Sequence, residues 1–186
     1  GKQSSMPCNT STPLLYYNKD MFKAAGLDPE KPPRTFDEVA QYAEKLSQRD
    51  AAGNVTVSGG AFAIYGWFVE QFLAVSGALY ANNGNGRDEN ATDAVFNGPE
   101  GVRVLEWWKS MVESGSFGNY GRTTVDTRNA FLAGQTAMFI DSISTPWLAA
   151  ASPKKQIATR SCPQYLAVKA KPAASGICPP TMPYPP

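Results

Sequence analysis

The sequence of 186 residues contains no histidine, which removes the commonest general base and the commonest ligand for transition metals. Hydrolytic triads that depend on histidine are therefore excluded. Cysteine is also scarce: Cys8, Cys162 and Cys178 are widely spaced and odd in number, so neither a zinc-binding spacing nor a complete disulfide framework is present. At most one disulfide bond can form within the chain, and whether Cys162 pairs with Cys178 stays open.

The sequence also lacks an excess of either charge. Its 17 basic and 16 acidic residues give a net charge of +1, without a run of Lys or Arg that could follow a nucleic-acid backbone. No stretch approaches the roughly 20 apolar residues of a membrane span, and no signal peptide opens the chain. We therefore expect neither nucleic-acid binding nor direct membrane insertion, and an exported protein would be represented here by its mature form or a fragment.

What the sequence does contain is typical of one globular domain, with 42% hydrophobic, 11% aromatic and 18% charged residues. Apolar runs between Gly and Pro predict strands, and a 3.6-residue apolar period with capping residues predicts helices. The expected strands, which should share one sheet, cover residues 14–17, 61–65 and 136–140, with a further strand near 177. The expected helices follow Asn18 and Thr35, cover 68–79, 97–112 and 124–134, and begin again at 144–146.

The segments between these elements are rich in Gly, Asn and Ser and predict turns over 50–60 and 82–93. Within 82–93, the residues Asn83, Asn85 and Asp88 faintly resemble a calcium loop. The acidic first ligand and the final Glu of that motif are missing, so we expect turn chemistry and no metal.

Two clusters of hydroxyl side chains are candidates for binding a polar ligand. Ser11 and Thr12 precede the first strand, and Ser142 follows the strand predicted at 136–140. Ser144 and Thr145 come next, where a helix N-terminus favours an anionic or polar oxygen. The alternative is that Ser144 or Thr145 only caps that helix; Ser142 is not needed as the cap and is the better candidate.

Trp67 follows Gly66 at the end of the strand predicted at 61–65, where its indole can stack on a sugar or a glycerol moiety. Packing in the core is an equally good interpretation. Trp107 and Trp108 lie within a predicted helix and receive no ligand role. The sequence shows neither a paired set of carboxylates nor an activated nucleophile, so it offers no basis for an enzyme.

The segment from Ser11 to Val39 carries the most specific pattern in the chain. It consists of the run STPLLYYNKDMFKAAGLDPE, which ends at Glu30, followed by Pro32, Pro33, Thr35 and Phe36. This pattern resembles the family 1 extracellular solute-binding proteins of ABC importers, and within them the glycerol-3-phosphate-binding members. Looser matches at 66–77, 96–112 and 120–138 extend the resemblance over most of residues 6–150.

The resemblance implies an α/β fold: one lobe of a type II periplasmic-binding-protein fold, helix-rich with a central mixed sheet. Residues 1–186 then form the carboxyl-side lobe between the two crossover strands, entered near Met6 and left near 177–184. Residues 152–186 form a return segment, of which 152–175 have no counterpart in the family. Cys8 stands where the family usually has Phe.

The resemblance also implies roles for individual residues. Ser11 and Ser142 match serines that contact ligand, and Trp67 matches one of two tryptophans that flank it. The second aromatic position falls at Ile64 or, with a shifted alignment, at Tyr65. The ligand-binding residues expected are therefore Ser11, Trp67, Ser142 and Tyr65, with no catalytic residue, cofactor or metal.

The function that the resemblance implies is the capture of a polar, hydroxylated solute in an interlobe cleft and its delivery to the membrane permease of an ABC importer. The solute expected is sn-glycerol-3-phosphate or a glycerophosphodiester, and the location is periplasmic or extracellular and membrane-associated. One alternative is a sugar- or oligosaccharide-binding importer component. A carbohydrate-active enzyme would need two carboxylates in one cleft, and a stand-alone interaction domain would need an exposed apolar patch.

Overall fold

The computed structural model describes residues 11–143 and 156–161. Helices and strands alternate along this part of the chain in the order β1 (Pro13–Asn18), α1 (Lys19–Ala24), α2 (Phe36–Leu46), β2 (Gln48–Arg49), β3 (Val55–Ala61), α3 (Gly66–Val75), α4 (Asn82–Gly86), α5 (Pro99–Glu113), β4 (Phe117–Gly118), α6 (Thr124–Ala133), β5 (Thr136–Ser142) and β6 (Ile157–Ser161).

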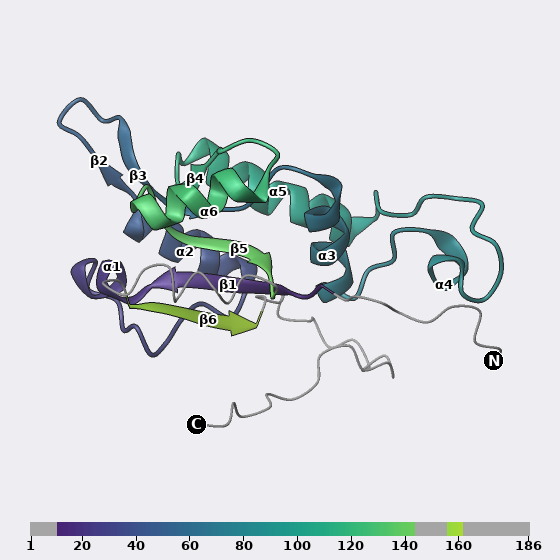
Figure 1. Cartoon of the computed structure of the whole chain (residues 1–186). Helices are drawn as coiled ribbons and strands as arrows, with labels where there is room; N and C mark the ends of the chain where they lie inside the picture. The colour runs from purple at the N-terminus through teal and green to yellow at the C-terminus, as the bar shows by residue number, and fades with distance from the viewer. Residues whose placement is uncertain (1–10, 144–155, 162–186) are drawn as a thin grey trace, which may run out of the picture.

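The strands form one mixed sheet in the order β2-β3-β5-β1-β6, with β4 beside β3. Strand β1 pairs antiparallel with β5 and with β6, whereas β3 pairs parallel with β5 (Figure 1). The expected α/β fold with a central mixed sheet is confirmed.

The strand directions place three chain segments at one edge of this sheet. Strands β3 and β5 both end there, and β1, which runs the opposite way, begins there. Helix α3 follows β3 at this edge, whereas α1 follows β1 at the opposite end, as Figure 1 shows. We call the end of the sheet beside α3 the carboxyl edge, because in α/β folds ligands bind outside the carboxyl ends of strands.

The helix signals of the sequence are confirmed at several ends. Asn18 caps α1 by accepting hydrogen bonds from the backbone N–H groups of Asp20 and Met21. Thr35, after which a helix was expected, forms a capping box with Glu38 at the start of α2. Gly134 ends α6 with a left-handed φ of 81°.

The strand predicted at 61–65 is wrong, because the strand is β3 and covers Val55–Ala61, most of which was expected to be a turn. Its glycines are there for packing. A Cβ on Gly59 would lie 1.7 Å from the carbonyl oxygen of Ala43 in α2, so only glycine lets the helix approach the strand this closely. The glycines that suggested a turn in the sequence instead allow close contact between β3 and α2.

Smaller differences also have physical reasons. Helix α3 begins at Gly66, so Trp67 lies in its first turn and not at the end of a strand. Helix α5 begins at Pro99 after Gly98, which caps it without a side-chain bond. The turn chemistry expected over 82–93 is confirmed by α4, in which Asn83, Gly84 and Asn85 are left-handed.

Strands β2, β4 and β6 were not predicted. The helix expected from 144–146, the strand near 177 and the three cysteines lie outside the residues that the structure describes. Of the return segment, 156–161 are described and contain β6, and the rest lies outside the described residues.

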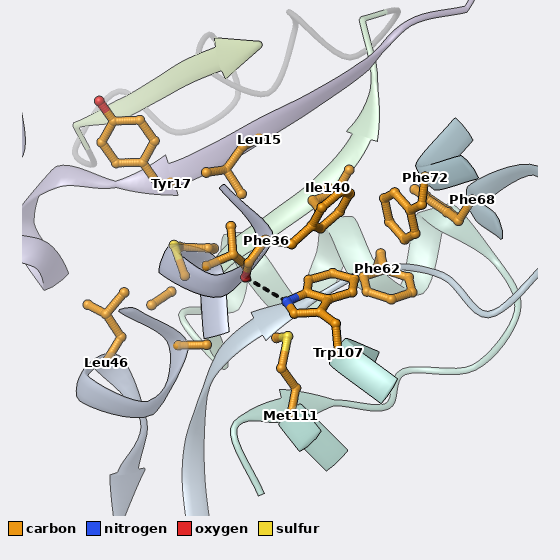
Figure 2. Packing of buried hydrophobic residues seen from close by; sticks show 14 of the residues in the cluster. Leu15, Tyr17, Phe36, Leu46, Phe62, Phe68, Phe72, Trp107, Met111 and Ile140 are labelled. Carbon is orange, nitrogen blue, oxygen red and sulfur yellow. Dashed lines mark hydrogen bonds between the residues drawn. The ribbon is translucent and has the colours of Figure 1, made fainter. Parts of the chain in front are cut away.

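One face of the sheet carries most of the buried aromatic side chains, between the sheet and helices α2, α3 and α5 (Figure 2). Phe62 lies against the rings of Phe72, Trp107 and Phe117 at centroid distances of 5.1, 6.0 and 4.9 Å. The indole N–H of Trp107 donates to the carbonyl oxygen of Phe36 at 2.6 Å. Trp107 is therefore part of the core.

The other face is covered by α6 and holds a smaller buried cluster of Tyr16, Ala61, Phe131 and Phe139. The ring of Phe139 lies 4.9 Å from that of Tyr16 and 4.7 Å from that of Phe131. Strand β5 therefore has apolar side chains on both faces until it reaches the carboxyl edge, where its sequence becomes polar.

Candidate functional site

The two predicted serines lie close together at the carboxyl edge. Ser142, the last residue of β5, pairs in register with Pro13 at the start of β1. The register continues beyond the strands, because the backbone N–H of Ile143 donates to the carbonyl oxygen of Thr12 at 2.8 Å. Ser11 precedes this pair and is exposed, while Ser142 is half-buried. Adjacent strands thus bring together residues that are far apart in the sequence.

Tyr65 and Trp67 form a stacked aromatic pair at the same edge, just beyond the end of β3. Their ring centroids lie 6.2 Å apart with an interplanar angle of 15°. Phe68, which is buried, contacts both rings edge to face at 5.1 and 4.9 Å. The backbone N–H of Ile64 donates to the carbonyl oxygen of Gly121 and fixes the loop ahead of the pair. Both aromatic rings are half-buried and supported from the core side.

Asp141 and Arg128 form an ion pair that the sequence analysis missed. The Nε–H of Arg128, on α6, donates to Oδ2 of Asp141 at 2.5 Å, and the side chains are 17% and 3% exposed. The second carboxylate oxygen of Asp141 accepts the backbone N–H of Ser142 at 2.7 Å. One buried carboxylate therefore holds both the guanidinium and the end of β5.

The charges of the ion pair also act on the hydroxyl of Tyr65. Burial raises the pKa of Tyr65 most, the Asp141 carboxylate raises it further, and the Arg128 guanidinium opposes them. Tyr65, Arg128 and Asp141 are thus electrostatic neighbours, and Asp141 links them to Ser142.

All four predicted site residues lie at or next to the carboxyl edge. Of the two candidates for the second aromatic position, Tyr65 stacks on Trp67, and Ile64 forms no part of this stack. Arg128 was missed because α6 and β5 each look ordinary in sequence, and only the turn at Gly134 folds Arg128 back onto Asp141. The polar Asp141 within an apolar strand was the available signal, since a buried carboxylate requires a partner. Ser144 and Thr145 lie outside the described residues.

The Asp141 carboxylate at the carboxyl edge is fully engaged in hydrogen bonds. Both oxygens of Asp141 accept hydrogen bonds, so this carboxylate is not a free general base. Across 11–143 and 156–161, no group of three or more His, Cys, Asp or Glu side chains is placed to hold a metal ion. In the same part of the chain, no helix is long and apolar enough to cross a membrane.

Comparisons with known proteins agree with this architecture. The family model for bacterial extracellular solute-binding proteins matches residues 2–168, and the chain belongs to this family. Its fold is that of the periplasmic-binding proteins, and its family is one of transport-associated binding proteins rather than enzymes.

Among curated relatives, the sn-glycerol-3-phosphate-binding periplasmic protein UgpB of Escherichia coli K12 is 44% identical over 141 residues, 74% of this chain and 30% of the relative. UgpB of Salmonella typhimurium is 45% identical over the same shares. The chain thus spans about a third of the length of the curated relatives that it matches.

Solved structures show the same fold with different ligands. A solute-binding protein from Thermotoga lettingae with bound α-D-tagatose is 26% identical, with a TM-score of 0.64, and the match covers 88% of this chain and 41% of that one. UgpB from Mycobacterium tuberculosis in complex with glycerophosphocholine is 18% identical, with a TM-score of 0.62, over 84% of this chain and 36% of that one. The second match establishes the fold alone.

Proposed function

We propose that this chain is the carboxyl-side lobe, between two crossover strands, of a two-lobe solute-binding protein that serves an ABC importer. In this proposal the carboxyl edge of the sheet is one wall of the ligand cleft, and a second lobe supplies the other wall. Closure of the two lobes around the solute by a hinge motion then presents the complex to the membrane permease. The protein acts in the periplasm, as the names of its curated relatives state for them, or outside the cell in association with the membrane.

The observation that carries the proposal is the gathering of Ser11, Ser142, Tyr65 and Trp67 at one edge of the sheet. Ser11 and Ser142 come from adjacent strand ends, and the stacked aromatic pair follows the parallel strand beyond them. Within 11–143 and 156–161, neither the Tyr65 hydroxyl nor the Trp67 indole N–H has a hydrogen-bond partner. Hydroxyl groups beside a supported aromatic surface can bind a solute that has both polar oxygens and C–H faces.

The solute that we propose first is sn-glycerol-3-phosphate or a glycerophosphodiester. The support is the identity of 44% to a relative named for sn-glycerol-3-phosphate, over a segment that includes most of the carboxyl edge. A sugar or oligosaccharide is the alternative, favoured by the stacked pair of Tyr65 and Trp67, because aromatic faces pack well on sugar rings.

Calorimetric titration of a full-length, two-lobe protein that contains this chain tests the proposal. Glycerol-3-phosphate, glycerophosphocholine and maltose are the probes, and we expect tight binding of at least one of them. Trp67→Ala should weaken that binding, whereas Trp108→Phe, a substitution in the core helix α5, serves as the control and should not. Binding that is unchanged by Trp67→Ala would remove the aromatic pair from the site.

The isolated chain should bind the same solute far more weakly. One wall supplies only part of the hydrogen bonds and leaves the solute open to water. Losing about 4 kcal/mol of contacts weakens binding roughly a thousandfold, from micromolar to millimolar. Micromolar binding by the isolated chain would show that its site is complete without a second lobe.

A further inference from the structure

The guanidinium of Arg128 is held by a buried carboxylate and still has N–H groups that are not used within the described residues. Its Nε–H is used by Asp141, and within the described part of the chain its two terminal nitrogens have no partner. These nitrogens are not sealed in the interior, because Thr127 Oγ1 is the one buried side-chain polar atom without a partner among the described residues. Arg128 therefore presents N–H donors to solvent from a fixed position.

The neighbouring carboxylate does not cancel this presentation. Asp141 is 3% exposed, and its two oxygens accept Arg128 Nε–H and the backbone N–H of Ser142. The negative charge thus lies on the protein side of the pair and the guanidinium on the solvent side. A ligand that approaches from solvent therefore meets the positively charged N–H donors of Arg128. Such donors favour an anionic oxygen.

The position of this cation on the carboxyl edge fits the same solute. Asp141 accepts the backbone N–H of Ser142 at the end of β5, and the charges of the ion pair act on the pKa of the Tyr65 hydroxyl. We propose that Arg128 binds a phosphoryl oxygen of the solute and that Asp141 acts as the positioning residue that aims the guanidinium. This inference rests on the proposed function and makes it narrower: the solute carries a phosphate, as a monoester or as a diester.

The experiment follows the Arg Nε–H resonances and backbone amides of the ¹⁵N-labelled chain during titration to tens of millimolar. The probes are sn-glycerol-3-phosphate, glycerophosphocholine and the neutral polyol D-mannitol. We expect at least one phosphate to shift the Arg128 Nε–H resonance and the amides of 65–67 and 142. The stronger of the two phosphates identifies a monoester or a diester as the preferred group.

The main variant is the double substitution Arg128→Gln with Asp141→Asn, which removes both charges and leaves no buried carboxylate unpaired. It should weaken phosphate binding by roughly tenfold or more, because a hydrogen bond to a charged group is lost. Arg128→Lys keeps the charge without the planar fork and should fall between the double variant and the wild type. Lys23→Gln removes one exposed positive charge on α1, at the opposite end of the sheet, and should leave phosphate binding unchanged.

Three other outcomes would contradict the role of Arg128, and they differ in whether the proposed function survives. Equal phosphate binding by the double variant would overturn the role of Arg128 and leave the proposed function in place. Binding of mannitol but of neither phosphate would also overturn the inference, in favour of the sugar-binding alternative. No response at the carboxyl edge to any probe would overturn the inference and the proposed function together.

Discussion

The two faces of the sheet differ in both size and chemistry. The face toward α2, α3 and α5 holds a large aromatic cluster, in which Phe62 touches five other rings. The face toward α6 has a small cluster around Phe139, followed at the carboxyl edge by the Arg128–Asp141 pair. The difference indicates that one face supplies most of the stability, while the other supports polar groups at the edge where a solute is proposed to bind.

The largest expected effect tests this division with two Phe→Ala substitutions, one on each face. Phe62→Ala should lower the free energy of unfolding by about 4 kcal/mol, because a rigid ring cluster cannot collapse into the cavity. Phe131→Ala, at an equally buried position in the smaller cluster, should cost less. Urea unfolding of both variants measures the difference. Equal losses would mean that the faces do not differ in stability.

The second prediction concerns the close approach of α2 to β3. Gly59→Ala should lower the free energy of unfolding by about 3 kcal/mol, because the new Cβ meets the backbone of Ala43, which cannot rotate away. At Gly60 the nearest atom to a Cβ is the flexible end of Met111, at 3.1 Å. Gly60→Ala is therefore the matched control and should cost much less in the same unfolding assay. The reverse order would contradict the packing explanation.

This pair of glycines also shows where sequence reasoning fails. The capping residues Asn18 and Thr35 act within a few residues of themselves, so their helices could be predicted. Gly59 is required by Ala43, which is distant in sequence, and its local context looked like a turn. The candidate site divides in the same way. Ser11, Ser142 and Trp67 carried a recognisable pattern, whereas Arg128 became visible only when the fold placed α6 against β5.

The third prediction addresses the polar end of the α6 face. Asp141→Asn should lower the free energy of unfolding by about 2 kcal/mol, because it weakens the bond to Arg128 and removes the charge that compensates a half-buried guanidinium. Adding Arg128→Gln should restore part of that loss, since no unpaired charge remains. Thermal unfolding of the single and double variants measures the coupling. Additive losses would show that the two charges act independently.

The smallest effect compares two tyrosines at opposite ends of the sheet. Burial is the main cause that raises the pKa of both Tyr17 and Tyr65 above the usual 10.0. Because the pKa is higher in the folded state, each hydroxyl ionises more easily in the unfolded chain. The contribution of each tyrosine to stability is therefore intact below about pH 10 and is lost as the pH rises through the folded pKa. Tyr65→Phe and Tyr17→Phe should therefore each reduce the fall in stability between about pH 9 and about pH 11.

Near neutral pH the same two substitutions should differ. The Tyr17 hydroxyl donates to the carbonyl oxygen of Pro29 at 2.9 Å, so Tyr17→Phe should lower the free energy of unfolding by about 1 kcal/mol. The Tyr65 hydroxyl has no partner within the described residues, so Tyr65→Phe should leave neutral stability nearly unchanged. Urea unfolding at neutral pH measures the loss of the hydrogen bond, and urea unfolding between about pH 9 and about pH 11 measures the effect of ionisation. A loss at neutral pH for Tyr65→Phe equal to that for Tyr17→Phe would mean that the Tyr65 hydroxyl serves the fold and is not kept free for a ligand.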